Sequence, residues 1–280
     1  MAGQPGADAT DATADSLEGC LVIVPAFNES TTLPKVIYDL RRLLPGADIV
    51  VVDDGSTDGT AETVPASVTL LRLPFNLGIG GAMQTGYRYA LRNGYRIAVQ
   101  VDGDGQHPAE EVARLIAAVD GTGVDLVIGS RFLEPGTYRQ TPARGIGSVL
   151  LRTAIRFVSG VALTDCTSGF RAANRRAIAL FARWYPDDYP EPEVAALLVR
   201  NGCRIIEVPA HMNPRSGGRS SITLGDGIVY VSKVAVALFL DLFRNPWKGA
   251  ERDPDRGAAG EPRAAMMPDP GAVSAWEHVP

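Results

Sequence analysis

Short apolar runs alternate with helical patterns through the first half of the chain. The run Leu21–Val24 ends at Pro25, and Thr31–Leu44 then repeats apolar residues at the spacing of an amphipathic helix. Further strand-like runs lie at 49–52, 68–71, 97–101 and 126–128, and further helical patterns at 78–93 and 108–119. This alternation predicts an α/β fold with a mostly parallel central sheet.

The second half of the sequence is less regular. We expect helices at 144–158, 174–182, 191–200 and 223–244, a strand at 204–208 and a polar loop at 214–221. The last helix is the most apolar, but Lys233 and Asp241 interrupt it, and no apolar run reaches the ~20 residues that a bilayer-spanning helix needs. It is therefore expected to be amphipathic and to face a membrane surface or an integral-membrane partner, the alternative being a helix packed wholly on the core.

The two ends of the chain differ in composition from its middle. Residues 1–19 carry acidic side chains, no basic ones and no apolar stretch of the kind found in a secretory signal. Residues 249–280 are rich in Gly, Pro and Ala without periodicity. We therefore expect disordered tails at 1–19 and 249–280, a globular domain at 20–222 and a helical segment at 223–248.

Charge and cysteine content exclude some classes of protein. The chain has 280 residues and a formal net charge of −5, which argues against nucleic acid as a partner. Its three cysteines, Cys20, Cys166 and Cys203, are widely spaced and lack a zinc-site or Cys-x-x-Cys pattern. This usage favours a reducing compartment such as the cytoplasm.

Polar residues follow three of the predicted strands. Pro25 ends the first run, the pair Asp53-Asp54 follows the second, and Asp102 follows the run at 97–101. Ligands of open α/β sheets bind beyond the carboxyl ends of the strands. These residues are therefore expected to meet in one cleft.

The segment after the 97–101 strand carries two carboxylates, Asp102 and Asp104, within the sequence Asp-Gly-Asp-Gly-Gln-His. Mg²⁺ and Mn²⁺ favour such oxygen ligands and keep open positions for substrate phosphates. An EF-hand is excluded, because His107 stands where that loop needs glycine. The segment predicts a divalent-cation site, the alternative being a plain acidic turn.

Other motifs leave more than one interpretation open. Asp53-Asp54 suits contact with the base and ribose of a nucleotide, or else a turn with a helix cap. The Gly-rich segment 76–81 follows the third strand rather than the first, so it does not fit a dinucleotide-binding fingerprint. Glu191 and Glu193 suit the first turn of a helix, and Arg215 and Arg219 suit either an anion clamp or a solvated connection.

Several segments, which follow one another in a characteristic order along residues 20–240, resemble those of a known family. They are 24–29, 51–60, 76–82, 102–108, 129–131 and 165–171, together with Glu191, Glu193 and 215–221. Over roughly residues 20–240 the chain resembles family 2 glycosyltransferases of the GT-A fold, and is similar within them to dolichyl- and polyprenyl-phosphate sugar synthases. The resemblance implies a single Rossmann-like GT-A domain with a C-terminal amphipathic helix.

The resemblance also implies roles for individual residues. The nucleotide sugar would be bound by Pro25, Asn28, Glu29, Asp53, Asp54, Gly78, Asp102, Arg215 and Arg219. Mg²⁺ or Mn²⁺ would be held by Asp102, Asp104 and Gln106. The acceptor phosphate would be bound by Arg131, Arg171 and Ser168. The candidate catalytic residues are Asp104, Glu191, Glu193 and Arg131.

The activity expected from this resemblance is inverting, metal-dependent transfer of a hexose from a nucleotide sugar to a polyprenyl phosphate. It would take place at the cytoplasmic membrane face. The alternative is transfer to a hydroxyl acceptor, such as a glycan or a small natural product, for which Glu191 or Glu193 would have to act as general base. A non-catalytic nucleotide-sugar-binding protein and a nucleotidyltransferase are weaker hypotheses.

Overall fold

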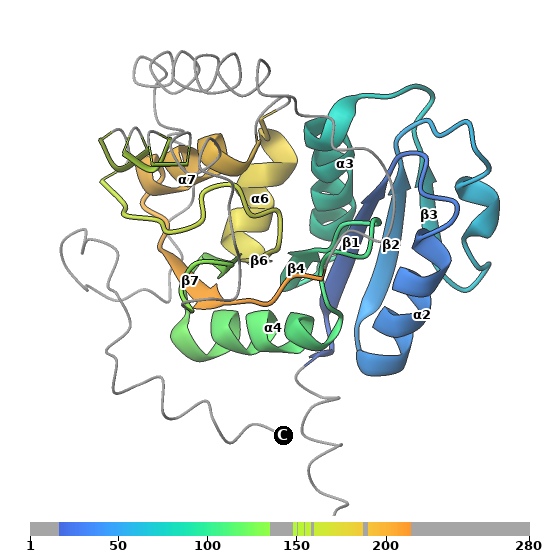
Figure 1. Cartoon of the computed structure of the whole chain (residues 1–280), viewed down its shortest axis with the longest axis horizontal. Coiled ribbons are helices and arrows are strands. Elements are labelled where there is room, and N and C mark those ends of the chain that lie inside the picture. Colours follow the sequence, from blue (N-terminus) through green and yellow to red (C-terminus); the bar gives the residue numbers. More distant parts are fainter. Residues whose placement is uncertain are drawn as a thin grey trace, which may run out of the picture.

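A computed structural model describes residues 17–134, 148–149, 151–153, 155–157, 160–186 and 190–213. Seven strands form one mixed sheet in the order β3-β2-β1-β4-β6-β5-β7 (Figure 1). The strands are β1 (Cys20–Ala26), β2 (Asp48–Asp53), β3 (Thr69–Arg72), β4 (Ile97–Gln100), β5 (Leu126–Ser130), β6 (Arg171–Asn174) and β7 (Ile205–Pro209). The helices are α2 (Leu33–Leu43), α3 (Gly78–Arg92), α4 (Glu110–Thr122), α6 (Arg175–Arg183) and α7 (Pro190–Arg200), with a short 3₁₀ helix, η1 (Ala61–Thr63).

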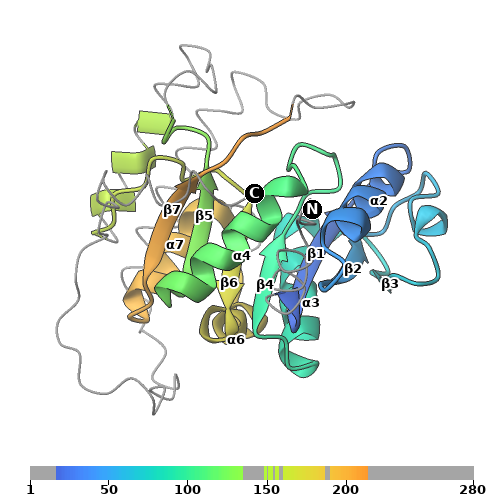
Figure 2. The same ribbon diagram turned by 90° about the horizontal axis from the view of Figure 1, so that it is seen from below.

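Helices cover both faces of the sheet. The apolar sides of α2 and α4 pack on one face, and those of α3, α6 and α7 pack on the other (Figure 2). All seven residues of β1 are buried, as expected for a central strand that is covered on both sides. This arrangement explains why the strands appear in the sequence as continuous apolar runs rather than as alternating patterns.

The predicted α/β fold with a mostly parallel sheet is confirmed. The strands expected at 21–24, 49–52, 68–71, 97–101, 126–128 and 204–208 all form, with ends that differ by a few residues. Of the helix expected at 144–158, residues 148–149, 151–153 and 155–157 are described and are helical. The loop at 214–221 and the helix at 223–244 lie wholly outside the described residues. Within the described part of the chain, no helix is long and apolar enough to cross a membrane.

The sequence pattern missed β6, which runs antiparallel between β4 and β5. Its pairing joins Gln100 to Arg171 and Arg171 to Ile128. The strand reads Arg-Ala-Ala-Asn, without the β-branched or aromatic residues that mark strands. Its two neighbours in the sheet, rather than its own composition, therefore determine its conformation.

Candidate active site

The loops that follow β1, β2 and β4 meet at the carboxyl edge of the sheet. The backbone N–H of Asp54 donates to the carbonyl of Ala26 over 2.9 Å, and that of Gly103 donates to the carbonyl of Pro25 over 3.3 Å. These two hydrogen bonds join the three loops to one another. The expected convergence of Pro25, Asp53-Asp54 and Asp102 on one region of the protein is thus observed.

The β1 loop is fastened to the β2 loop by side chains from both. Asn28 has a left-handed backbone, with φ of 57°, and its N–H donates to Ser56 Oγ over 2.9 Å. The Asn28 side-chain oxygen accepts from the N–H of Thr57, also over 2.9 Å. The N–H of Glu29 donates to Thr60 Oγ1 over 2.8 Å. Asn28 and Glu29, two of the residues predicted to bind the nucleotide sugar, are therefore held in fixed backbone positions.

Asp58 completes this connection, although the sequence analysis did not single it out. Its carboxylate accepts hydrogen bonds from the N–H of Ser30 and from both the N–H and the hydroxyl of Thr60. The Thr60 hydroxyl contributes most to lowering the pKa of Asp58 to about 2, and the Ser30 N–H lowers it further. An acid two residues before a threonine in a polar turn was the available sequence signal.

Asp53 and Asp54 lie inside the fold. The fully buried Asp53 accepts from the N–H of Ser56 over 3.0 Å through Oδ1, and its Oδ2 lies 3.4 Å from Arg72 Nε. That distance satisfies an ion pair, but the geometry does not make a hydrogen bond, and Oδ2 has no hydrogen-bond partner among the described residues. Asp53 is thus a buried carboxylate with spare acceptor capacity beneath the predicted nucleoside site.

Asp54 holds the start of α3. Its two carboxylate oxygens accept from the N–H groups of Leu77, over 2.7 Å, and Gly78, over 2.9 Å. Burial raises the pKa of Asp54, the two N–H groups oppose that rise, and the negative charge of Asp53 adds to it. Gly78 has a φ of +80°, a conformation that glycine adopts without strain. Asp54 therefore caps the helix, which is the alternative interpretation weighed for this motif.

The loop after β4 carries Asp102 and Asp104. The Asp102 side chain is 35% exposed, whereas Asp104 is buried and its Oδ1 accepts from the N–H of Gln106 over 3.0 Å. No group of three or more His, Cys, Asp or Glu side chains with metal-site geometry occurs among the described residues. Two carboxylates on one loop fit a Mg²⁺ or Mn²⁺ ion that takes its remaining ligands from substrate phosphates, Gln106 and water.

The β5 end of the sheet carries Arg131 in a network of buried acids. Its guanidinium Nε donates to Asp165 Oδ2 over 2.6 Å, and Nη2 donates to Asp165 Oδ1 over 2.7 Å and to Thr167 Oγ1 over 2.8 Å. Glu207 on β7 accepts from the N–H groups of Thr164 and Asp165, each over 2.7 Å. Burial raises the pKa of Glu207, and these two hydrogen bonds oppose the rise. Asp165 and Glu207 thus determine where Arg131 lies, and sequence analysis assigned neither a role of its own.

Ser168 and Arg171 are interior residues, which differs from the expectation that they contact an acceptor phosphate. The Ser168 hydroxyl donates to the carbonyl of Gly129 over 2.6 Å and accepts from the N–H of Phe170. Arg171 is 1% exposed, and its Nε donates to the carbonyl of Ser168 over 2.7 Å. The reason is the insertion of β6, which places Arg171 within the sheet rather than on its edge.

The remaining predicted residues lie near or beyond the limits of the described chain. Glu193 is buried on α7, whereas the side chain of Glu191 and the whole of Arg215 and Arg219 lie outside the described residues. The last described residue, Asn213, donates its N–H to the carbonyl of Gln106 over 2.9 Å. The segment after β7 therefore returns to the loop that carries Asp102 and Asp104.

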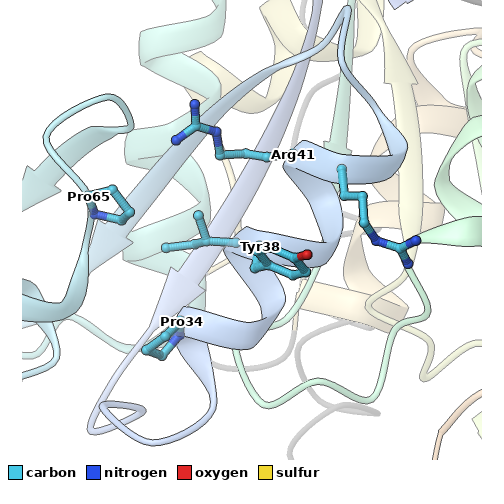
Figure 3. Close-up of a pocket in the computed structure, with 6 residues that line it drawn as sticks. Pro34, Tyr38, Arg41 and Pro65 are labelled. Atoms are coloured by element: carbon cyan, nitrogen blue, oxygen red, sulfur yellow. The ribbon is translucent and has the colours of Figure 1, made fainter.

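An open hollow of about 500 Å³ lies on the outer side of α2, away from these loops (Figure 3). It is lined by Pro34, Ile37, Tyr38, Arg41, Arg42 and Pro65. It contains none of the residues predicted to bind the nucleotide sugar, the cation or the acceptor phosphate. We therefore take the carboxyl edge of the sheet, where the charged groups converge, as the candidate active site.

Comparisons with known proteins show what the chain is similar to. The model of "Glycosyl transferase family 2" matches residues 21–181. The chain is 34% identical over 233 residues to the polyprenol monophosphomannose synthase of Mycolicibacterium smegmatis, covering 79% of this chain and 87% of the relative. It is 36% identical over 230 residues to the undecaprenyl-phosphate mannosyltransferase of Micrococcus luteus, covering 78% and 94%.

A solved structure shares the fold. The glucosyl-3-phosphoglycerate synthase of Mycobacterium tuberculosis, solved with Mn²⁺, uridine diphosphate and glucosyl-3-phosphoglycerate, superposes with a TM-score of 0.60. The two sequences are 22% identical, and the match covers 89% of this chain and 88% of that one. At this identity the likeness supports the GT-A-like fold and no more.

Proposed function

The chain belongs to glycosyl transferase family 2 and is a glycosyltransferase, and we propose that it transfers a hexose from a nucleotide sugar to a polyprenyl phosphate. Mannose is the first sugar to test, because both relatives above are named for its transfer. The reaction would invert the configuration at the anomeric carbon.

One observation supports the proposal most directly. Gln100 and Ile128 pair with the same residue of β6, so Asp102 and Ser130, each two residues further on, reach the same edge of the sheet. They are separated by two strand spacings, roughly 10 Å. A hexose bound between the Asp102–Gln106 loop and Arg131 would have its departing diphosphate on one side and an attacking phosphate on the other.

On the donor side, Asp102, Asp104 and Gln106 would hold a divalent cation together with the donor diphosphate. A bound Mg²⁺ or Mn²⁺ supplies positive charge that stabilises the departing diphosphate. Asp102 is the more exposed carboxylate and is suited to direct contact with it. Asp104 is fixed by the Gln106 N–H, which prevents its side chain from rotating away.

The nucleoside would lie over the joined β1 and β2 loops. Pro25, Asn28 and Glu29 would border it, with Asp53, Asp54 and Gly78 below. Asp53 is fully buried, so it would support the base through the Ser56 N–H that it holds, and Asp54 would act through the α3 start that it caps. Arg215 follows Asn213 by two residues, and we propose that Arg215 and Arg219 bind the donor diphosphate beside Gln106.

On the acceptor side, Arg131 is proposed to orient the lipid phosphate. A phosphate monoester is already an anionic nucleophile, so its attack needs no general base. Arg131 is held by Asp165 with its side chain 20% exposed, so it is pre-positioned before the acceptor arrives. Under this proposal Glu191 and Glu193 contribute to positioning and not to proton transfer.

The acceptor requires access to a membrane, and we propose that residues 223–248, after the domain at 20–222, supply it from the cytoplasmic face. The apolar character of 223–244 supports an interfacial helix, since Lys233 and Asp241 would be costly inside hydrocarbon. Flotation of the full chain with anionic liposomes tests this, with neutral liposomes for comparison. Failure to bind either would argue for a membrane-protein partner or a non-membrane acceptor.

The activity itself is tested with purified full-length protein, Mn²⁺ or Mg²⁺, a panel of nucleotide sugars and a short polyprenyl phosphate, with mass spectrometry of the products. A glycosyl phospholipid is the expected product. A parallel reaction that contains hydroxyl acceptors in place of the lipid tests the alternative. Products only in that second reaction would overturn the lipid-phosphate assignment and leave the family assignment unchanged.

A further inference from the structure

We propose that His107 is a positioning residue that fixes the carboxylate of Asp102 in the orientation needed to bind a divalent cation. The inference rests on the proposed metal dependence and extends it to a residue that would not contact the metal. The inference follows from the contacts that His107 and Gln100 make with Asp102, and from the packing of Phe170 on the His107 ring.

Both ring nitrogens of His107 face Asp102. The backbone N–H of Asp102 donates to His107 Nδ1 over 3.0 Å, and His107 Nε2 lies 3.6 Å from Asp102 Oδ2. Because Nδ1 accepts a hydrogen bond, a neutral imidazole carries its proton on Nε2. The ring therefore holds the backbone of Asp102 by a hydrogen bond, and its Nε2 lies beside the Asp102 carboxylate at 3.6 Å, which is longer than a direct hydrogen bond.

The ring of His107 is itself held in place. It is buried and stacks on Phe170, with ring centroids 4.8 Å apart and an angle of 26° between the planes. Phe170 is fully buried, and a Cβ added at Gly129 would lie 2.7 Å from its ring, so there is no room for the ring to move in that direction. The core thus holds the imidazole in a fixed position beside the loop that carries Asp102 and Asp104.

The other oxygen of Asp102 is also restrained. Gln100 Nε2 donates to Asp102 Oδ1 over 3.1 Å. A Cβ added at Gly169 would lie 2.9 Å from Gln100 Nε2 and 3.5–3.6 Å from the two Asp102 oxygens, which shows how closely the backbone approaches this group. Each carboxylate oxygen therefore has its own neighbour, Gln100 for Oδ1 and His107 for Oδ2.

A carboxylate offers about four lone-pair sites, so the hydrogen bond from Gln100 to Oδ1 and the nearby imidazole beside Oδ2 leave others for a cation. Residues that orient a metal ligand in this way typically change metal affinity by about 10–100-fold when they are substituted. The Asp102 carboxylate depends on neighbouring side chains for its orientation more than the Asp104 carboxylate does. Asp104 is buried, whereas the Asp102 side chain is 35% exposed.

Two substitutions separate positioning from packing. His107→Phe keeps an aromatic ring against Phe170 but removes both nitrogens, whereas His107→Gln loses the stacking but keeps an N–H donor near the position of Nε2. If His107 positions Asp102, the Gln variant binds Mn²⁺ more tightly than the Phe variant. If His107 only packs, both variants bind Mn²⁺ as the unmodified chain does and differ only in melting temperature.

The experiment titrates the full-length chain with Mn²⁺ alone and measures free Mn²⁺ by electron paramagnetic resonance, with melting temperatures recorded in parallel. We expect about a 10–100-fold loss of Mn²⁺ affinity in His107→Phe and a smaller loss in His107→Gln. Tyr95→Phe serves as control, because it removes a hydrogen bond to Asp48 at the amino ends of the strands. Its Mn²⁺ affinity should equal that of the unmodified chain.

Asp104→Asn distinguishes the two ways in which the inference can fail. If the unmodified chain shows no Mn²⁺ binding that depends on Asp104, the metal assignment is wrong and this inference is overturned with it. If Asp104-dependent binding is present and His107→Phe leaves it unchanged, only the role of His107 is overturned. Should His107→Phe fail to fold, His107→Gln and His107→Asn are compared with the unmodified chain, and unchanged affinity in both overturns the role.

Discussion

Arg131 and Asp165 form a bidentate ion pair at the carboxyl edge of the sheet, with Nε 2.6 Å from Oδ2 and Nη2 2.7 Å from Oδ1. The Asp165 carboxylate also accepts from the N–H of Arg131 over 3.1 Å. The same acid thus holds both the backbone and the side chain of the residue proposed to bind the acceptor phosphate. The stability of this part of the fold and the position of Arg131 should therefore depend on Asp165.

Replacing Asp165 by Asn should lower the free energy of unfolding by about 2–3 kcal/mol. The change leaves Arg131 without its buried charged partner. The expected loss of unfolding free energy is at or below the range for fully buried pairs, because the Arg131 side chain is one-fifth exposed. Chemical denaturation measures the effect. The control is Asp120→Asn, which breaks the exposed pair with Arg96, exposed 42% and 38%, and should cost less than about 1 kcal/mol. Equal losses in the two variants would contradict a structural role for the Arg131 pair.

Asp104→Asn should lower turnover by about 100-fold or more while leaving the fold intact. Asparagine can still accept the Gln106 N–H through its side-chain oxygen, but it removes one negative charge from the proposed cation site. Turnover measured at increasing Mn²⁺ concentration checks the loss of activity, and the melting temperature checks that the fold is intact. Glu110→Gln, on the exposed side of α4, serves as the charge-matched control. Near-normal turnover of Asp104→Asn, or of the unmodified chain in excess chelator, would refute the metal site.

Glu193→Gln should reduce kcat by less than about tenfold when a polyprenyl phosphate is the acceptor. An anionic phosphate needs no general base, whereas loss of such a base usually costs at least about 100-fold. Steady-state kinetics of the variant and of Glu191→Gln with the lipid acceptor make the comparison. A 100-fold loss in either variant with that acceptor would show that a proton is transferred after all.

Asp58→Asn should have an effect on stability that depends on pH. The pKa of Asp58 is about 2 in the folded protein and ordinarily 3.8, so the charged carboxylate favours the folded state above about pH 4. That contribution is lost as the pH falls from about 4 towards 2. The difference in urea unfolding midpoint between the unmodified chain and the variant should be constant from pH 7 to 5 and narrow below pH 4. A difference that does not change with pH would mean that the carboxylate is not held as described.

The cysteine thiols should resist modification in the folded protein. Burial raises the pKa of Cys20 to about 11 and that of Cys166 to about 12, and Cys203 is also buried as a free thiol. Iodoacetamide at pH 8, followed by mass spectrometry, should label these residues slowly in the native chain and rapidly after denaturation in guanidinium. Rapid labelling of the native protein would show that the sheet opens locally near these residues.

Periodicity in the sequence was sufficient to predict most elements of the fold. Strands covered on both faces are continuous apolar runs, and helices such as α2 repeat apolar residues every three or four positions, so local pattern and final structure agree. The convergence of Pro25, Asp53-Asp54 and Asp102 also followed, because the carboxyl ends of parallel strands share one edge. The bound species and the segments beyond Asn213 remain proposals.

Residues whose role depends on a distant partner could not be assigned from the sequence. β6 has no strand-like composition of its own and exists because β4 and β5 pair with it. Arg171 and Ser168 are buried beside that insertion, whereas the family resemblance implied that they bind the acceptor phosphate. Likewise Asp165 and Glu207 are ordinary acids in the sequence, and only the pairing of β5 with β7 brings Glu207 to the backbone of Thr164 and Asp165.

The sequence by itself determined the order along the chain of the helices and of the strands other than β6, the edge of the sheet that carries the chemistry and the two carboxylates suited to a divalent cation. Each of these depends on the spacing of residues close together along the chain. The tertiary structure alone decided which polar groups hold the fold and which can face a substrate. That division depends on contacts between residues far apart in sequence, as the stacking of His107 on Phe170 and the ion pair of Arg131 with Asp165 show.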